Sequence, residues 1–175
     1  PSVLVWALAT VFAGTAAPGR AQGLPQGGVA IHGQAQITQP AAHQLLVTTQ
    51  NGPGTNHSAI NWQSFNIGSG ASAYFAQPSA ASTSINRVLT NTPSALFGSL
   101  GSNGHLVLVN QAGIAIGAGA MIDVAGFTAS TLGMRDADAI AGRLRFGDAG
   151  VLGSALLTVD GQILARYGDA VLIAP

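Results

Sequence analysis

Apolar residues alternate with small or polar residues in short runs through the middle of the chain. The clearest pairs are Leu106 and Leu108, Ile114 and Ile116, and Ile122 and Val124. Because alternate side chains of a strand lie on one face, each pair predicts a short strand whose apolar residues point into a shared interior. Residues 110–113 and 117–119 carry Asn, Gln and Gly, which suit the tight turns that such short strands need.

The spacing of these pairs limits the architecture. Ile114 to Ile122 is a step of eight residues, which is too short to hold a crossover helix. Antiparallel hairpins and a solenoid with strands on successive walls both remain compatible with it. Residues 156–174 repeat the pattern with uneven spacing, which favours a β-helix, although the Asp160-Gly161 turn would also suit a hairpin.

The flanking regions predict further strands around Val29 and Ile31, Ile37, and Leu45 and Val47, with turns at Gly27-Gly28, Gln39-Pro40 and residues 51–54. Residues 60–68 read as one strand, in which Trp62 and Phe65 would anchor opposite faces. Phe75, Phe97 and Phe127 are expected to be further core anchors. A short helical turn is expected only after Thr92, with Pro93 at its first position, so helix should stay below about a tenth of the chain.

The composition limits the classes of function that the protein can have. The 175 residues are 47% hydrophobic and 7% charged with zero net charge, so one domain with a sizeable core is expected. A neutral chain has no electrostatic preference for nucleic acid or for an anionic membrane surface. Every basic residue is Arg, every acidic residue is Asp, and cysteine is absent, which excludes disulfides and thiolate chemistry.

Residues 2–17 form an uncharged, mostly apolar run that ends in small residues and is followed by Pro18 and Gly19. At about 16 residues this run is shorter than the roughly 20 that span a bilayer, and no stop-transfer flank follows. The pattern predicts a signal peptide over residues 1–21 that lacks its positive n-region, with cleavage after Ala21. Residues 22–175 would then form one exported domain that continues into a longer β-helix.

Candidate chemistry is sparse. His32, His43 and His57 are too far apart in sequence for a metal-binding pair, and no cofactor or metal is expected. Residues 133–150 hold the densest charges and read as a loop between coils, in which Asp136 and Asp138 would be solvated. The isolated Arg87 is expected to be a solvated rim residue or, preferably, a donor to backbone carbonyls.

Three long blocks of the chain resemble one known family. They are INWQSFNIG at 60–68, INRVLTNTPSALFGSLGSNGHLVLVNQAGIAIGAGAMIDVAGFTAST at 85–131, and VDGQILARYGDAVLIAP at 159–175. In this order they resemble the filamentous-haemagglutinin N-terminal domain, the secretion domain of two-partner-secretion exoproteins. The resemblance implies an all-β fold, a right-handed parallel β-helix with an N-terminal cap and small extra-helical strands.

The resemblance also implies two functional segments. The family's Asn-Pro-Asn-Gly-Ile motif falls on Asn110, Gln111, Ala112, Gly113 and Ile114, of which Asn110, Gly113 and Ile114 match. Its tryptophan-containing strand falls on Asn61, Trp62, Gln63, Ser64, Phe65 and Asn66. These matching residues are the candidates for transporter recognition or for a fold motif.

The expected function is therefore non-enzymatic. The chain would be the N-terminal secretion domain of a large exported adhesin, recognised by an outer-membrane transporter with periplasmic docking domains and nucleating β-helix folding at the surface of a Gram-negative bacterium. The domain would be a monomer, and host-cell or surface glycans would bind a downstream region. Two alternatives remain: a polysaccharide-active β-helix enzyme using Asp123, Asp160 or Asp169, and a structural cell-surface solenoid exported by another route.

Overall fold

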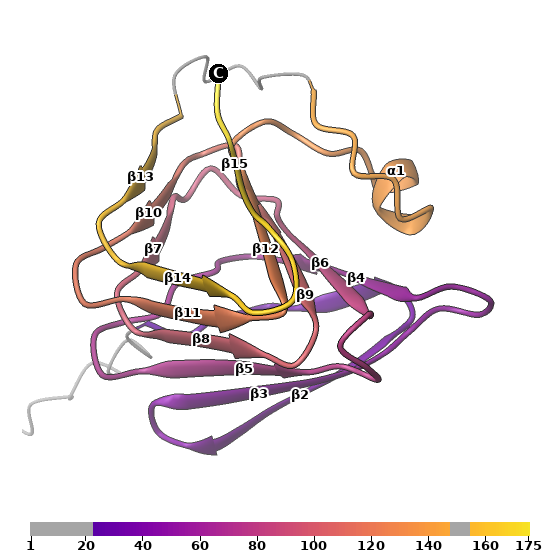
Figure 1. Ribbon diagram of the computed structural model, residues 1–175, viewed down its shortest axis with the longest axis horizontal. Helices are drawn as coiled ribbons and strands as arrows, with labels where there is room; N and C mark the ends of the chain where they lie inside the picture. Colours follow the sequence, from indigo (N-terminus) through magenta and orange to yellow (C-terminus); the bar gives the residue numbers. More distant parts are fainter. Residues whose placement is uncertain (1–22, 148–154) are drawn as a thin grey trace, which may run out of the picture.

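The computed structural model describes residues 23–147 and 155–175, and it forms a coil with three walls (Figure 1). The predicted signal peptide lies outside the described residues. From β3 onward successive strands lie on different walls, and the path through β13, β14 and β15 in Figure 1 makes the coil right-handed. The solenoid prediction is confirmed, and hairpins are confined to the first strands.

The first wall is a six-stranded sheet in the order β1-β4-β6-β9-β12-β15. Its strands are β1 (Val29–His32), β4 (His57–Trp62), β6 (Thr83–Val88), β9 (His105–Val109), β12 (Gly126–Ser130) and β15 (Ala170–Ile173). The second wall has the order β2-β3-β5-β8-β11-β14. Its strands are β2 (Gln34–Ala41), β3 (Gln44–Gln50), β5 (Ser72–Ala76), β8 (Ser99–Ser102), β11 (Met121–Val124) and β14 (Gln162–Ala165). The third wall is β7 (Ser94–Leu96), β10 (Ile114–Ile116) and β13 (Leu157–Val159).

The first two strands close the coil at its N-terminal end. β1 pairs antiparallel with β4 and β2 pairs antiparallel with β3, whereas the later strand pairs of the three walls are parallel. The cap therefore covers the edges on which a preceding coil would otherwise stack. The turn expected at Gln39-Pro40 is wrong, because both residues lie within β2 and the chain turns at residues 42–43.

The interior holds the apolar pairs that the alternation predicts. Leu106 and Leu108, Ile114 and Ile116, and Ile122 and Val124 are each 2% exposed or less and belong to one core cluster. Ile114 lies on β10 and Ile122 on β11, so the eight-residue step carries the chain from one wall to the next. Phe75 and Phe127 are buried as expected, but Phe97 is 45% exposed and does not anchor the core.

Two expectations around the aromatic residues are wrong. The strand predicted over residues 60–68 ends at Trp62, and the chain turns there, so Trp62 and Phe65 enter the same core instead of opposite faces. No helix follows Thr92; Ser94–Leu96 is strand β7. Pro93 precedes that strand, because parallel pairing with β10 overrides the local preference for a helical first turn.

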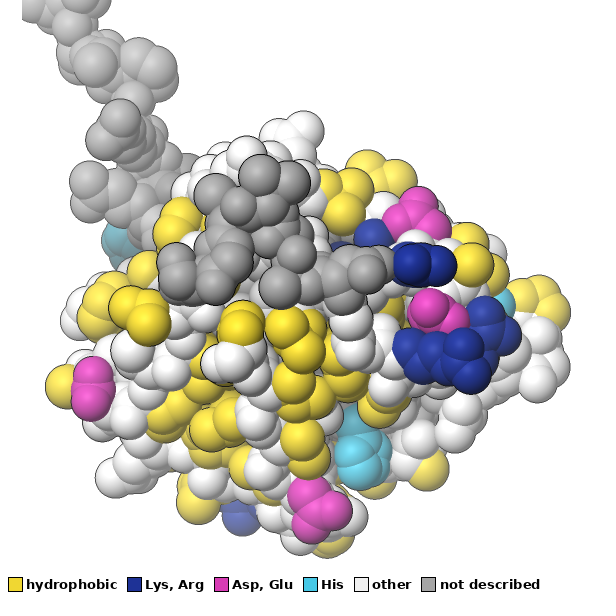
Figure 2. Space-filling view, turned by 90° about the horizontal axis from the view of Figure 1, so that it is seen from above, with side chains coloured by type: hydrophobic (Ala, Val, Ile, Leu, Met, Phe, Trp, Pro, Cys, Tyr) yellow, Lys and Arg dark blue, Asp and Glu magenta, His cyan; other side chains and the backbone are white. Residues whose placement is uncertain are grey.

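A second, smaller core lies on the outer face of the first wall. Val107 and Val109 point outward from β9 and pack with Met134 and Ala139 of the segment that follows β12. This segment contains α1 (Asp136–Ile140), the one helix of the described residues. The segment is therefore packed on the sheet and is not simply a solvated loop. The Asp136 side chain is 68% exposed as expected, but that of Asp138 is only 14% exposed, so its expected solvation is wrong. Figure 2 shows basic and acidic side chains gathered on one side of the molecule.

Polar contacts hold the α1 segment in place. Arg87, 7% exposed, pairs with Asp136 at 2.7 Å, so its partner is a carboxylate and not the backbone carbonyls that were expected. Asp138 accepts a hydrogen bond from Arg143 Nε at 2.8 Å. At the far end of α1, His57 Nε2 donates to the Ile140 carbonyl at 2.9 Å.

Candidate functional site

The Asn110 side chain joins two coils. It is fully buried at the end of β9, and its Nδ2 donates to the Thr92 carbonyl at 3.0 Å and to Ser94 Oγ at 2.9 Å. Its Oδ1 accepts the backbone N–H of Ala112 at 2.9 Å, which closes the turn. One amide thus caps its own turn and bonds the preceding coil, and no donor or acceptor of Asn110 faces solvent.

Gly113 makes the rest of this turn possible. Its φ of +124° lies in a region that L side chains rarely adopt, and its carbonyl accepts the N–H of Ser94 at 2.9 Å. The next residue, Ile114, is 1% exposed and starts β10. The three residues that match the family motif are therefore a cap, a left-handed turn residue and a core anchor.

Trp62 lies at the centre of an aromatic cluster under the cap. Its ring is 1% exposed and meets Phe65 edge-on, with ring centroids 5.5 Å apart, and Phe75 at 6.4 Å. Its Nε1 donates to Asn86 Oδ1 at 2.9 Å, which satisfies the polar atom of an otherwise apolar side chain. Asn86 was not among the predicted site residues.

The neighbours of Trp62 tie the cap to the next coil. Ser64 and Gln63 bond the backbone of Gln26 through their own backbone groups, and Asn66 Oδ1 accepts the N–H of Ala95 at 2.8 Å. Asn61 Oδ1 is buried without a hydrogen-bond partner among the described residues. Residues 61–66 are therefore a junction between the cap, the core and β7.

The structure brings the two predicted segments to opposite sides of β7. Asn66 bonds residue 95 from the preceding coil, whereas Asn110 bonds residues 92 and 94 from the following one. Ile67 forms a bridge with Leu96 on the first side, and β10 pairs along the second. Sequence reasoning missed Thr92 and Ser94, because Pro93 between them suggested the start of a helix.

Among the described residues, the charged and titratable side chains meet in pairs. No group of three His, Cys, Asp or Glu residues that could hold a metal occurs within residues 23–147 and 155–175. Arg166 donates two hydrogen bonds to Asp123, at 2.5 and 2.6 Å, and this bonding holds the pKa of the Asp123 carboxyl below its usual value. A carboxylate kept ionised in this way is a poor general acid. Burial, with a smaller contribution from His57, lowers the pKa of His32, whose ring stacks on that of His57 at 4.4 Å.

Among the described residues, no helix is both long and apolar enough to cross a membrane. The described chain is thus a three-walled right-handed β-helix with an antiparallel cap and buried asparagine turns between its coils. That architecture, together with the two motif segments on either side of β7, defines a solenoid domain whose coils are joined by buried polar side chains.

Comparison with known proteins places this solenoid in a family. The chain belongs to the TPS (two-partner secretion) secretion-domain family, whose family model matches residues 21–173. It is 31% identical in sequence to the HMW1 secretion domain from Haemophilus influenzae, whose crystal structure superposes with a TM-score of 0.68 over 85% of this chain and 36% of that one.

Curated relatives point to the same family. Two heme/hemopexin-binding proteins of Haemophilus influenzae are similar, at 37% identity over 111 residues and 33% over 107 residues. These matches cover 63% and 61% of this chain but only 12% and 11% of the relatives. The match therefore spans about an eighth of the relatives' length.

Family membership settles the function at the level of the domain. The chain is a secretion domain of a two-partner-secretion exoprotein, and such domains travel through the periplasm to the cell surface or the extracellular space. The family is one of secretion domains and not of enzymes, and its function implies recognition by an outer-membrane transporter. The polysaccharide-active enzyme and the solenoid exported by another route are not favoured.

Proposed function

We propose that the transporter reads residues 61–66 and 110–114 before the domain folds, and that folding then buries the Trp62, Phe65 and Asn110 side chains within them. The observation that carries this proposal is the burial of their key side chains. Asn110 is fully buried with its amide bonded to Thr92, Ser94 and Ala112, and Trp62 is 1% exposed. A partner cannot bind these groups on the folded domain without breaking the core.

An unfolded chain, in contrast, offers the same residues with free backbone donors and acceptors. An extended segment of this kind can add as a strand to the edge of a sheet on the transporter's periplasmic domains. The apolar alternation around each segment would then contribute side-chain specificity on one face of the added strand.

Burial of the two segments also gives export a direction. Outside the cell, residues 61–66 and 110–114 would close on β7 from both sides, so the Trp62, Phe65 and Asn110 side chains would become buried as the first coils form. A chain whose motif is buried can no longer rebind the transporter. Stacking of further coils would add apolar burial with each turn and would oppose backsliding without ATP.

The test compares two asparagines of similar structural weight. Asn110→Ala removes three hydrogen bonds and leaves Ser94 Oγ without that donor in the interior, so it should cost about 2–4 kcal/mol of folding stability. Asn86→Ala is the matched control, because Asn86 is 1% exposed and also makes three side-chain hydrogen bonds, from Trp62 Nε1 and to the Ser84 carbonyl and Oγ, but lies outside both segments. Secreted yield and denaturation midpoint are measured for both variants.

We expect secretion of the Asn110→Ala variant to fall far below that of the Asn86→Ala variant, whose side chain is equally buried and makes as many hydrogen bonds. A direct assay supports the comparison: the purified periplasmic domains of the transporter should bind the urea-unfolded chain after dilution and should not bind the refolded one. Equal binding to the folded chain, or equal secretion of the two variants, would refute recognition before folding.

We propose the remaining features of the exoprotein from the same family logic. Residues 1–21 would be removed as a signal peptide, so mass spectrometry of secreted material should find an N-terminus near Gln22. The domain from residue 22 to 175 would be the monomeric start of a longer adhesin-like β-helix. Host-cell or surface glycans would be targets of the downstream coils, whose activity this domain does not determine.

A further inference from the structure

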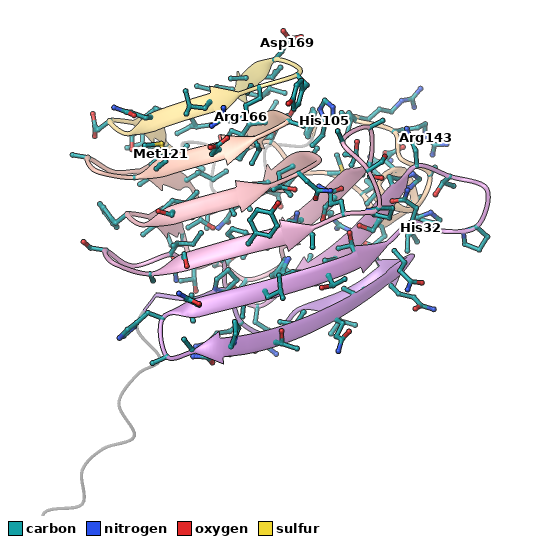
Figure 3. All side chains as sticks on the ribbon, turned by 60° about the horizontal axis from the view of Figure 1, so that its bottom comes forward. His32, His105, Met121, Arg143, Arg166 and Asp169 are labelled. Carbon is teal, nitrogen blue, oxygen red and sulfur yellow. The ribbon has the colours of Figure 1, made fainter. Side chains whose placement is uncertain are left out.

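The outer face of the second wall carries a groove whose lining lies outside both proposed recognition segments. It has a volume of about 570 Å³ and crosses strands β5, β8 and β11 to the turn after β14. The residues that line it include both tyrosines of the chain, Tyr74 and Tyr167, together with the ion pair of Asp123 and Arg166. Arg166 lies on this outer face, toward the end of the strands opposite Met121 (Figure 3). We propose that this groove binds a neutral oligosaccharide.

The floor of the groove is an aromatic ring lying on the sheet. Tyr74, Gly101 and Asp123 occupy one lateral row on three successive coils. A Cβ at Gly101 would lie 2.8 Å from the Tyr74 ring, so the ring covers the space that a side chain at position 101 would fill. Tyr74 nevertheless stays 45% exposed, so part of its side chain is open to a ligand in the groove. The weakly positive C–H face of a sugar packs favourably on such a ring, whose face is electron-rich.

The ion pair supplies directional hydrogen bonding beside that ring. Asp123 lies two strand spacings, about 10 Å, from Tyr74. Arg166 uses Nε and one Nη2 hydrogen to bond Asp123, which leaves three of its five N–H donors for other partners. The two carboxylate oxygens keep free lone pairs. Neighbouring sugar hydroxyls, which both donate and accept, match a fixed set of donors and acceptors of this kind.

Charge selects a neutral ligand. The guanidinium and the carboxylate compensate each other, so the groove attracts neither anions nor cations by net charge. Asn103 at the rim is already used by the Gln77 backbone and serves to shape the edge. Tyr167, 77% exposed, provides a second aromatic wall next to Arg166.

The experiment is ligand-observed saturation-transfer NMR on the purified, folded chain. The probes are maltohexaose, cellohexaose, chitohexaose and mannohexaose, with an oligogalacturonate as the anionic comparator. At least one neutral probe should bind, and more tightly than the oligogalacturonate. Tyr74→Ala should weaken that binding on the order of tenfold or more, whereas Tyr74→Phe, which keeps the ring, should bind nearly as well as the parent chain.

Controls separate a ligand site from a structural staple. Phe97→Ala removes an aromatic side chain that is also 45% exposed but lies outside the groove, and it should leave binding unchanged. Asp123→Asn should weaken sugar binding while the denaturation midpoint shows that the chain is still folded. Binding by none of the neutral probes, preference for the oligogalacturonate, or unchanged binding by a folded Tyr74→Ala variant would each overturn the proposal. None of these readouts depends on the transporter.

Discussion

Removing the indole of Trp62 should destabilise the domain severely. Trp62 is 1% exposed and contacts Phe65 and Phe75 in the core below the cap. Truncation of a buried Trp or Phe to Ala typically costs about 3–5 kcal/mol through lost burial and the cavity that remains. The change also leaves Asn86 Oδ1 without its donor, which adds about 1 kcal/mol or more. The expected loss for Trp62→Ala is therefore at least about 4 kcal/mol.

A loss of this size is a large fraction of the whole stability, because domains of this kind are stable by about 5–15 kcal/mol. With a urea slope of about 2 kcal/mol/M, the denaturation midpoint should fall by about 2 M. Trp62→Phe provides a milder probe that keeps an aromatic ring but removes the Nε1 donor. We expect it to cost less than half as much as the alanine variant.

The indole hydrogen bond can be isolated with a double-mutant cycle. Asn86→Ala is made alone and with Trp62→Phe, and urea unfolding is followed by far-ultraviolet dichroism, since the fluorescence of Trp62 is lost. The two changes should be non-additive by about 1 kcal/mol, because either one removes the same bond. A Trp62→Ala loss below about 1.5 kcal/mol, or strictly additive changes, would refute the tight packing and hydrogen bonding of this cluster.

Three further predictions concern other parts of the molecule. Asp136→Ala should leave the Arg87 guanidinium buried without its carboxylate, and hydrogen exchange in the α1 segment should become faster. Adding Arg87→Leu should restore part of the protection against exchange. Faster exchange in the double variant than in Asp136→Ala would contradict the pairing. Folding stability should fall as the pH drops through about 6.5, because the pKa of His32 is lowered in the folded chain and the unfolded chain therefore binds a proton on His32 more readily. Urea midpoints measured against pH should show this fall, and His32→Gln should flatten the profile. Gly113→Ala should lower the stability by about 1 kcal/mol or more, because φ is +124° there, and an unchanged urea midpoint would show that the turn relaxes.

The sequence determined the wall strands well. The two-residue period of a strand is a local property of the chain. It is enough to place pairs such as Leu106 and Leu108, or Ile114 and Ile116, on the strand face that points into the core. The Asn, Gln and Gly residues that follow these strands indicate turns, which also depend on the local sequence. The resemblance then supplied the choice of a right-handed coil, which the alternation alone left open against hairpins.

The tertiary structure decided what the polar and aromatic residues do. Asn110 reads locally as a turn residue worth one hydrogen bond, yet it makes three, and two of them reach a coil that precedes it by 16 and 18 residues. Arg87 pairs with the carboxylate of Asp136, which lies on α1, a helix that was not predicted from the sequence. Such partners are set by which coils stack on one another, because a pattern of period two fixes the face of a side chain but not its neighbour on the next coil.

The stacking of the coils also decides where the aromatic residues lie. Trp62 and Phe65 are an odd number of positions apart, so a continuous strand would send them to opposite faces, and only the turn after Trp62 brings both rings into one core. Tyr74 and Tyr167 are 93 residues apart, and no local pattern joins them. They line one groove because the second wall stacks β5, β8, β11 and β14 in order, a juxtaposition that exists only once the coil is closed.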